Sequence, residues 1–146
     1  MTTSSYDVTA YPVAGLPERV TIYEVGPRDG LQNESELVPT EVKVELVRRL
    51  LAAGLPVVEA TSFVHPRWVP QLADAEELLT ALGRPDLPVL VPNERGLDRA
   101  LAMGCRHIAI FGSATETFAQ RNLNSSLEGQ FALFEPVVRR ALAEGG

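Results

Sequence analysis

The sequence predicts an α/β fold with a parallel sheet, because short β-branched apolar runs alternate with helical patterns along the chain. Four runs are typical of strands, at residues 20–25, 56–63, 87–91 and 107–111. A segment with apolar residues at helical spacing follows each run. Parallel strands need such crossover connections, which are right-handed in nearly all known proteins.

The first two helices are predicted from apolar spacing and from end signals. Thr40 is a plausible N-cap of the first helix, and Gly54 is an expected stop. Its apolar face is predicted to contain Val42, Leu46, Leu50 and Leu51. The second helix begins at about Pro70 and ends at Gly83. Its apolar side is predicted to contain Leu72, Ala75, Leu78, Leu79 and Leu82.

The third and fourth helices are separated by a polar segment. Asn93 is the expected N-cap of a short third helix that Gly104 ends. Residues 112–126 are predicted to form a polar loop. The last helix is predicted to carry Leu127, Phe131, Phe134, Val138 and Leu142. Pro136 is expected to kink or restart this helix, because proline has no backbone N–H to donate.

Composition is typical of a soluble globular domain, with 146 residues of which 45% are hydrophobic and 22% charged. The net charge of −6 argues against a broad nucleic-acid or anionic-membrane surface. No apolar run approaches the roughly 20 residues that span a bilayer. The single cysteine, Cys105, cannot form an internal disulfide, so we expect a cytoplasmic protein. Residues 1–19 are expected to be a flexible tail before a folded part at 20–146.

Polar side chains follow the predicted strands. They include Arg28 and Asp29, Thr61 and Ser62, Asn93, and several residues between 113 and 124. Two architectures fit this arrangement, a small doubly wound sheet and half of an eight-stranded barrel, because both place their sites at the carboxyl ends of the strands. No glycine-rich nucleotide-binding motif follows the first strand, which disfavours a dinucleotide or nucleoside-triphosphate site.

Arg28 and Asp29 are the main candidates for chemistry. A carboxylate offers hard oxygen ligands to a divalent cation, and a neighbouring guanidinium can hold a developing oxyanion. The alternative is a solvated turn, since Gly-Pro and Asp-Gly are common turn signals. Glu59 lies within an apolar strand, so its carboxylate must be paired or protonated. Pairing with Arg28 across adjacent strands would satisfy both groups.

Four motifs, in this order, resemble those of the hydroxymethylglutaryl-CoA lyase family: EVGPRDGLQNE at 24–34, EATSFVHPRWVPQ at 59–71, VPN at 91–93, and IFGSATE at 110–116 with NLN at 122–124. The resemblance extends from about Val20 to the C-terminus. It implies that residues 20–146 form the N-terminal (β/α)4 half of a TIM-type (β/α)8 barrel. Related condensing synthases share Arg-Asp-Gly but usually carry an acid where this chain has Leu31, so the lyase is favoured.

The resemblance implies cleavage of 3-hydroxy-3-methylglutaryl-CoA to acetoacetate and acetyl-CoA, a reaction of leucine degradation and ketone-body formation. Arg28 would hold the thioester enolate, and Glu59 would act with it as a catalytic residue. Asp29 would be a ligand of Mg²⁺ or Mn²⁺. Gln32 and Ser62 would contact the carboxylate or the CoA arm of the acyl-CoA substrate.

The resemblance also implies an incomplete site, because family members have about twice this length. Their His-x-His metal ligands, an asparagine and a catalytic cysteine come from later strands, whereas His65 and His107 form no such pair. We therefore expect little turnover from these 146 residues alone. We also expect either a homo-oligomer or association with a C-terminal half. The alternatives are a related synthase or aldolase, and a non-catalytic half-barrel that binds acyl-CoA.

Several other residues are expected to be structural. Phe63 and Trp68 are predicted to be core anchors, and Cys105 a small apolar filler. His65 is expected to be a solvated loop residue, and Glu24 is expected to have a structural role.

Overall fold

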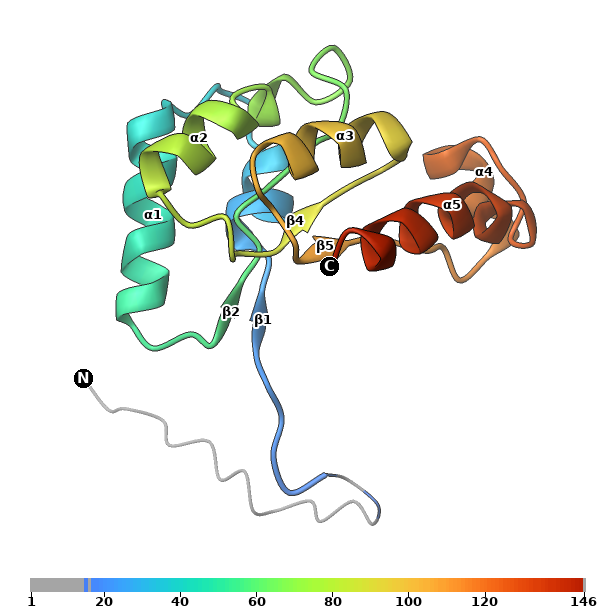
Figure 1. Cartoon of the computed structure of the whole chain (residues 1–146), viewed down its shortest axis with the longest axis horizontal. Coiled ribbons are helices and arrows are strands. Elements are labelled where there is room, and N and C mark those ends of the chain that lie inside the picture. The colour runs from blue at the N-terminus through green and yellow to red at the C-terminus, as the bar shows by residue number, and fades with distance from the viewer. Residues whose placement is uncertain (1–14, 16, 146) are drawn as a thin grey trace.

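In a computed structural model that describes Gly15 and residues 17–145, the chain forms an α/β structure with parallel strands (Figure 1). The predicted tail, 1–19, lies mostly outside the described residues. In chain order the elements are β1 (Tyr23–Glu24), a π-helical turn η1 (Gly26–Gly30), α1 (Thr40–Ala52), β2 (Val57–Val58), β3 (Thr61–Ser62), a 3₁₀ turn η2 (Pro70–Leu72), α2 (Ala75–Leu82), β4 (Val89–Leu90), α3 (Glu94–Ala102), β5 (Ile108–Ala109), α4 (Glu116–Leu123) and α5 (Gly129–Ala143).

The strands pair in two parallel sets, β1 with β2 and β3 with β4 and β5. The predicted strand 56–63 is therefore two short strands. Its backbone changes partner at the junction, where Glu59 N–H donates to Glu24 O at 2.8 Å and Ala60 N–H donates to Pro88 O at 2.9 Å. The two sets thus follow one another in the order expected for consecutive βα units. The first predicted strand is shorter than 20–25, because pairing with β2 covers only Tyr23 and Glu24.

The helix end signals are only partly confirmed. Asn93 caps α3 as predicted, accepting a hydrogen bond from Gly96 N–H at 3.0 Å. Gly83 ends α2 in the left-handed conformation, with φ of 63°. The prediction for Thr40 is wrong, because Pro39 occupies the N-cap position and Thr40 is already helical. The Thr40 hydroxyl instead donates to Asp74 Oδ2 at 2.7 Å, which joins the start of α1 to the start of α2. The second helix likewise begins as the turn η2, and its α-helical part starts only at Ala75.

The predicted polar loop at 112–126 contains the helix α4. Ala119 is the only buried residue of α4, so the helix has no apolar face of the kind from which helices are predicted. Thr115 caps it by accepting from Phe118 N–H at 3.3 Å. α5 begins at Gly129, so Leu127 precedes it, and the helix runs through Pro136 without restarting.

The core lies between the strands and the helices that curve around them (Figure 1). Fully buried members include Val47, Val58, Phe63, Leu78, Val89, Val91 and Leu97. On α1 the buried residues are Lys43, Val44 and Val47, whereas Val42, predicted for the apolar face, is 51% exposed. Apolar residues cover a wide arc of α1, and only packing against α2 and β2 selects the buried part.

The prediction that Trp68 is a core anchor is wrong, because this residue is 83% exposed. It lies in the turn between β3 and η2, where backbone hydrogen bonds to His65 O fold the segment away from the core. Phe63 is a core residue as predicted, and Cys105 is buried, with burial raising its thiol pKa to about 11. In the part of the chain that the structure describes, no helix has the length and apolar content that crossing a membrane requires.

A buried ion pair joins α1 to the segment before α2. Lys43 is 3% exposed, and its ammonium donates to Asp74 Oδ1 at 2.7 Å and to the backbone oxygen of Gln71 at 2.5 Å. A buried charge without its partner is costly, because neither water nor a counter-ion then compensates it. This cluster therefore fixes the packing of the first two helices behind β2 and β3.

We expect Asp74→Ala to lower the free energy of unfolding by about 3 kcal/mol, because it leaves the Lys43 ammonium buried without its carboxylate. Urea denaturation followed by circular dichroism measures this loss. Asp86→Ala is the matched control, since it removes an exposed ion pair with Arg84 and should cost at most about 1 kcal/mol. Equal losses for the two variants would contradict the role of the buried pair.

Candidate functional site

The turn η1 holds Arg28 and Asp29 at the carboxyl end of β1. The carbonyl of Val25 accepts hydrogen bonds from Arg28 N–H at 3.1 Å and Asp29 N–H at 2.7 Å. The segment is thus a single turn of π-helix. Single π-type turns are rare and occur frequently at functional sites. The geometry presents two successive charged side chains from one rigid turn.

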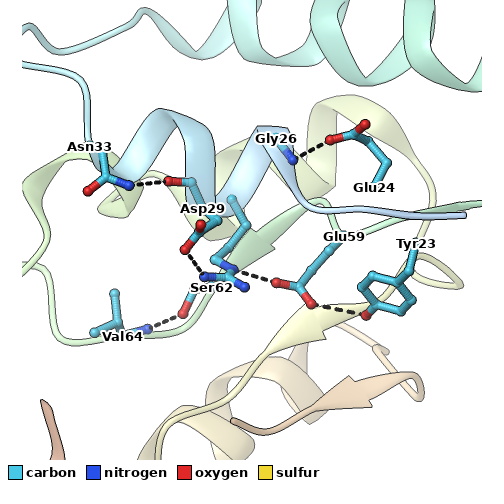
Figure 2. Close-up of polar contacts among 9 residues, drawn as sticks. Tyr23, Glu24, Gly26, Asp29, Asn33, Glu59, Ser62 and Val64 are labelled. Atoms are coloured by element: carbon cyan, nitrogen blue, oxygen red, sulfur yellow. Dashed lines mark hydrogen bonds and ion pairs between the residues drawn. The ribbon is translucent and has the colours of Figure 1, made fainter. Parts of the chain in front are cut away.

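Glu24 stabilises the entry to this turn. Its Oε1 accepts from Gly26 N–H at 2.6 Å (Figure 2). A Cβ at position 26 would lie only 2.7 Å from the same oxygen, so glycine is required there unless the carboxylate moves. This contact agrees with the structural role expected for Glu24.

Arg28 bridges two carboxylates, one buried and one exposed. Its Nε donates to Glu59 Oε1 at 2.5 Å, and its Nη1 donates to Asp29 Oδ1 at 2.6 Å. The side chain of Glu59 is 3% exposed, whereas that of Asp29 is 53% exposed. The pairing of Arg28 with Glu59 that the sequence predicted is therefore present. Because Glu59 comes from the β2–β3 junction, this contact connects the first two βα units.

Tyr23 completes the site, and the sequence pattern did not predict its role. Its hydroxyl donates to Glu59 Oε2 at 3.0 Å (Figure 2), so both oxygens of the buried carboxylate have a donor. Burial, followed by the charge of Glu59 and this hydrogen bond, raises the pKa of Tyr23 well above its usual value, and the charge of Arg28 opposes the rise. Tyr23 pairs with Val57, two residues before Glu59 in the neighbouring strand. The sequence signal that could have identified Tyr23 was a tyrosine on one strand placed diagonally across from a buried acid on the next.

Ser62 and Gln32 are less accessible than a substrate-binding role suggests. Ser62 is fully buried at 0% exposure, and its hydroxyl accepts from Val64 N–H at 3.2 Å. Gln32 is half-buried in the turn that follows η1. Asn33, which was not predicted, donates from Nδ2 to the backbone oxygen of Asp29 at 2.7 Å and so fixes that residue (Figure 2).

A hollow of about 600 Å³ adjoins this cluster. Tyr23, Val57 and Glu59 line it on one side, and Ile108 and Ile110 on the other. Alternate residues of a strand point to the same face, so Val57 and Glu59 mark the face of the strands opposite the helix-covered core. Glu59 therefore lies at the wall of a space large enough for part of a small molecule, and Arg28 is bonded to it.

The side chains of this site can supply one oxygen ligand to a divalent cation but not a complete set of ligands. Asp29 is an exposed carboxylate, the kind of oxygen donor that Mg²⁺ and Mn²⁺ prefer. Across Gly15 and residues 17–145, no three His, Cys, Asp or Glu side chains gather closely enough to hold a metal ion. Arg28, Asp29 and Glu59 are thus brought together as one site, in which Asp29 carries the exposed carboxylate and Glu59 the buried one.

Residues 19–145 match the model of the HMGL-like family. The chain belongs to the HMGL-like family. It is 52% identical to the mitochondrial hydroxymethylglutaryl-CoA lyase of Arabidopsis thaliana, over 87% of this chain and 28% of that protein. It is 53% identical to the cytoplasmic 3-hydroxy-3-methylglutaryl-CoA lyase of Danio rerio, over 89% of this chain and 40% of that protein.

The solved hydroxymethylglutaryl-CoA lyase of Pseudomonas aeruginosa superposes with a TM-score of 0.81 and 43% identity, covering 88% of this chain and 44% of that one. The lyase of Bacillus subtilis superposes with a TM-score of 0.80. The HMGL-like chain therefore spans less than half the length of these relatives. Its fold is part of their TIM-type barrel, which confirms the predicted (β/α)4 architecture over the doubly wound sheet.

We expect the phenol of Tyr23 to stay protonated around pH 10, where an ordinary tyrosine loses its proton. The absorbance at 295 nm of the native protein minus that of Tyr23→Phe isolates this group, and the difference should show no tyrosinate near pH 10. In the Glu59→Gln variant, the phenol of Tyr23 should titrate closer to pH 10, because the charge of Glu59 is gone.

The raised pKa of Tyr23 also determines how the stability of the fold changes with pH. A pKa raised in the folded state means that folding retains the proton, so the stabilisation is fully present below about pH 10 and is lost as the pH rises above it. Titration of Tyr23 at its ordinary pKa in the folded protein would contradict the contact with Glu59.

Proposed function

We propose that this chain supplies half of the active site of a carbon–carbon lyase that cleaves 3-hydroxy-3-methylglutaryl-CoA to acetoacetate and acetyl-CoA. The observation that carries the proposal is the Arg28 guanidinium, held between Glu59 and Asp29 at the carboxyl end of β1. The four relatives described above are named as hydroxymethylglutaryl-CoA lyases, and a further solved structure that this chain resembles is an HMG-CoA lyase in complex with coenzyme A and 3-methylmalate. These names favour cleavage over condensation by a related synthase or aldolase.

Arg28 is proposed to bind the thioester oxygen of the substrate. Its guanidinium keeps its charge at any physiological pH and donates several hydrogen bonds in one plane. Nε and Nη1 are engaged by Glu59 and Asp29, which leaves the remaining donors of the fork for an oxygen in front of it. Glu59, buried and held by Tyr23, fixes the orientation of that fork before the substrate arrives.

The proposed reaction is the breaking of the bond between C2 and C3 of the substrate. A base outside the residues assigned here takes the proton of the tertiary hydroxyl, the C3–O bond becomes a ketone, and acetoacetate departs. The electron pair moves to C2 and to the thioester oxygen, which becomes an enolate. Arg28 stabilises this negative charge where it develops, and a proton added to C2 gives acetyl-CoA.

Asp29 is proposed as one ligand of a divalent cation, Mg²⁺ or Mn²⁺. When bound, such a cation orients the hydroxyl and carboxylate of the substrate and makes the hydroxyl proton easier to remove. Asp29 suits this role because it is exposed, its carboxylate is held by Arg28 and its backbone oxygen is held by Asn33. The other ligands would come from residues beyond these 146, as would the base and the proton donor.

Gln32 and Ser62 remain proposed contacts of the carboxylate or of the CoA arm. Ser62 would have to become accessible when substrate binds, because its hydroxyl is now buried against Val64. Relatives named as mitochondrial and as cytoplasmic both match the chain, so the family alone does not set the compartment. A cytoplasmic location stays a prediction from the single buried Cys105.

We expect a complex of this chain with the unmatched part of the Pseudomonas aeruginosa lyase to release acetoacetate when Mg²⁺ or Mn²⁺ is added. Arg28→Gln in that complex should lower kcat by about 10²- to 10³-fold, because a donor to the developing enolate is lost. Asp29→Asn should raise the cation concentration needed for half-maximal activity. Arg49→Gln, which breaks an exposed pair with Glu45, is the matched control and should change neither value.

Two outcomes would contradict the proposal. Acetoacetate release by the 146-residue chain alone would show that no outside ligand or base is needed. Binding of CoA esters in calorimetry, with no turnover in the complex and no effect of Arg28→Gln, would favour a non-catalytic acyl-CoA-binding module.

A further inference from the structure

The loop between η1 and α1 has no regular structure of its own. Residues 33–39 contain no helix or strand, and most of them are exposed. The bonds at the start of this loop are local, because Asn33 N–H donates to Gly30 O at 3.1 Å and Glu34 N–H donates to Leu31 O at 3.2 Å. Ordering exposed backbone costs conformational entropy, so another part of the fold must hold such a loop in one conformation.

Gln71, in η2, holds this η1–α1 loop. Its Nε2 donates to the backbone oxygen of Glu34 at 2.8 Å. The loop follows β1 and η2 follows β3, so the bond joins the first βα unit to the second. The EATSFVHPRWVPQ motif ends at Gln71, and the proposed reaction uses no atom of this side chain. The contact with Glu34 gives the last residue of the motif a physical role.

The backbone of Gln71 is itself fixed. Its carbonyl oxygen accepts from the Lys43 ammonium at 2.5 Å, and the same ammonium donates to Asp74. Lys43 is 3% exposed, and Leu72, which follows Gln71 in η2, is 1% exposed. A buried charge and a buried side chain therefore hold η2 in place. The amide of Gln71 reaches Glu34 from a rigid position.

The segment between β3 and η2 is also fixed at its start, by Arg99 of α3. Arg99 Nη1 donates to the backbone oxygen of Val64 at 3.3 Å. Its Nε and Nη2 donate to the two carboxylate oxygens of Glu76 at 2.7 and 2.9 Å, which gives the guanidinium a defined orientation. Gln71 thus lies at the end of a segment that is held at both ends.

The side chain of Asn33 carries the restraint from Glu34 to Asp29. Asn33 directly precedes Glu34, and its Nδ2 donates to the backbone oxygen of Asp29 at 2.7 Å (Figure 2). Gln32 lies in the same turn. The side chain of Asp29 is 53% exposed, so packing restrains it little. Its position depends on the hydrogen bonds of Arg28 and of this turn.

The Gln71–Glu34 bond contributes little to the stability of the whole fold. It is exposed, so water can replace either partner when the bond is lost. The buried pair of Lys43 and Asp74 holds α1 against the start of α2 without the side chain of Gln71. Removal of the side-chain donor should therefore loosen the η1–α1 loop and leave the core intact.

We propose that Gln71 is a positioning residue of the lyase site. Its amide holds the η1–α1 loop, and through Asn33 the loop holds Asp29 in place for a divalent cation and Gln32 in place for the substrate. The proposal rests on the proposed function, which gives Asp29 and Gln32 these roles. Gln71 acts through the loop and touches neither the cation nor the substrate.

Hydrogen exchange of the 146-residue chain, measured by NMR, tests the restraint without any activity. Gln71→Met keeps the length of the side chain and removes the donor. The amides of Asn33 and Glu34 should then exchange about fivefold faster, because one neutral hydrogen bond is lost. The amide of Gly83, at the end of α2, should not change. Gln120→Met is the matched control, since it removes an exposed glutamine hydrogen bond in α4 and should alter none of these amides.

The effect on Asp29 is tested in the complex of this chain with the unmatched part of the Pseudomonas aeruginosa lyase. Mn²⁺ alone is titrated into the complex, and the free ion is measured by electron paramagnetic resonance. Gln71→Met should weaken Mn²⁺ binding about tenfold, as the loss of a group that orients a metal ligand does. At saturating Mn²⁺, KM should rise while kcat stays within about twofold, because the reacting groups are unchanged. Gln120→Met should change none of these values.

Three outcomes would overturn the proposal. They are unchanged exchange of the Asn33 and Glu34 amides in Gln71→Met, faster exchange with unchanged Mn²⁺ binding, and a loss of kcat that accompanies an equal loss of thermal stability. The last result would show a purely structural role. If Gln71→Met weakens Mn²⁺ binding as expected but the native complex releases no acetoacetate, the positioning role stands and the lyase proposal fails instead.

Discussion

The site depends on satisfying the buried carboxylate of Glu59 with hydrogen bonds. A carboxylate that is 2% exposed has lost most of its water, so protein donors must replace it. Arg28 supplies one donor from η1 and Tyr23 supplies the other from β1. The turn η1, the strand β1 and the β2–β3 junction must therefore all be in place to hold the guanidinium of Arg28. Its orientation depends on the fold and not on η1 alone.

The junction at Glu59 also determines how the strands are arranged. Its backbone N–H bonds to β1, while the next residue bonds to the segment before β4. The chain changes neighbours at the same residue whose side chain reaches Arg28. This explains why a single predicted strand becomes β2 and β3, and why the first βα unit is linked so closely to the second.

The two faces of the strands have different roles. One face packs on α1, α2 and α3 and includes the Lys43–Asp74 pair, which holds the helices together. The opposite face carries Tyr23 and Glu59 and borders the hollow. In a complete barrel that face is enclosed, so the hollow borders the inside of the barrel to which these strands belong.

The sequence by itself determined the alternation of strands and helices, the cap at Asn93, and the pairing of Arg28 with Glu59, because these follow from local periodicity and from the need to neutralise a buried acid. The roles of Arg28, Asp29 and Glu59 in catalysis stay predictions. Only the tertiary structure decided the contact of Tyr23, the exposure of Trp68, the helix α4 and which residues of α5 are buried. Each of these depends on which neighbour covers a side chain, and a pattern along one chain does not contain that information.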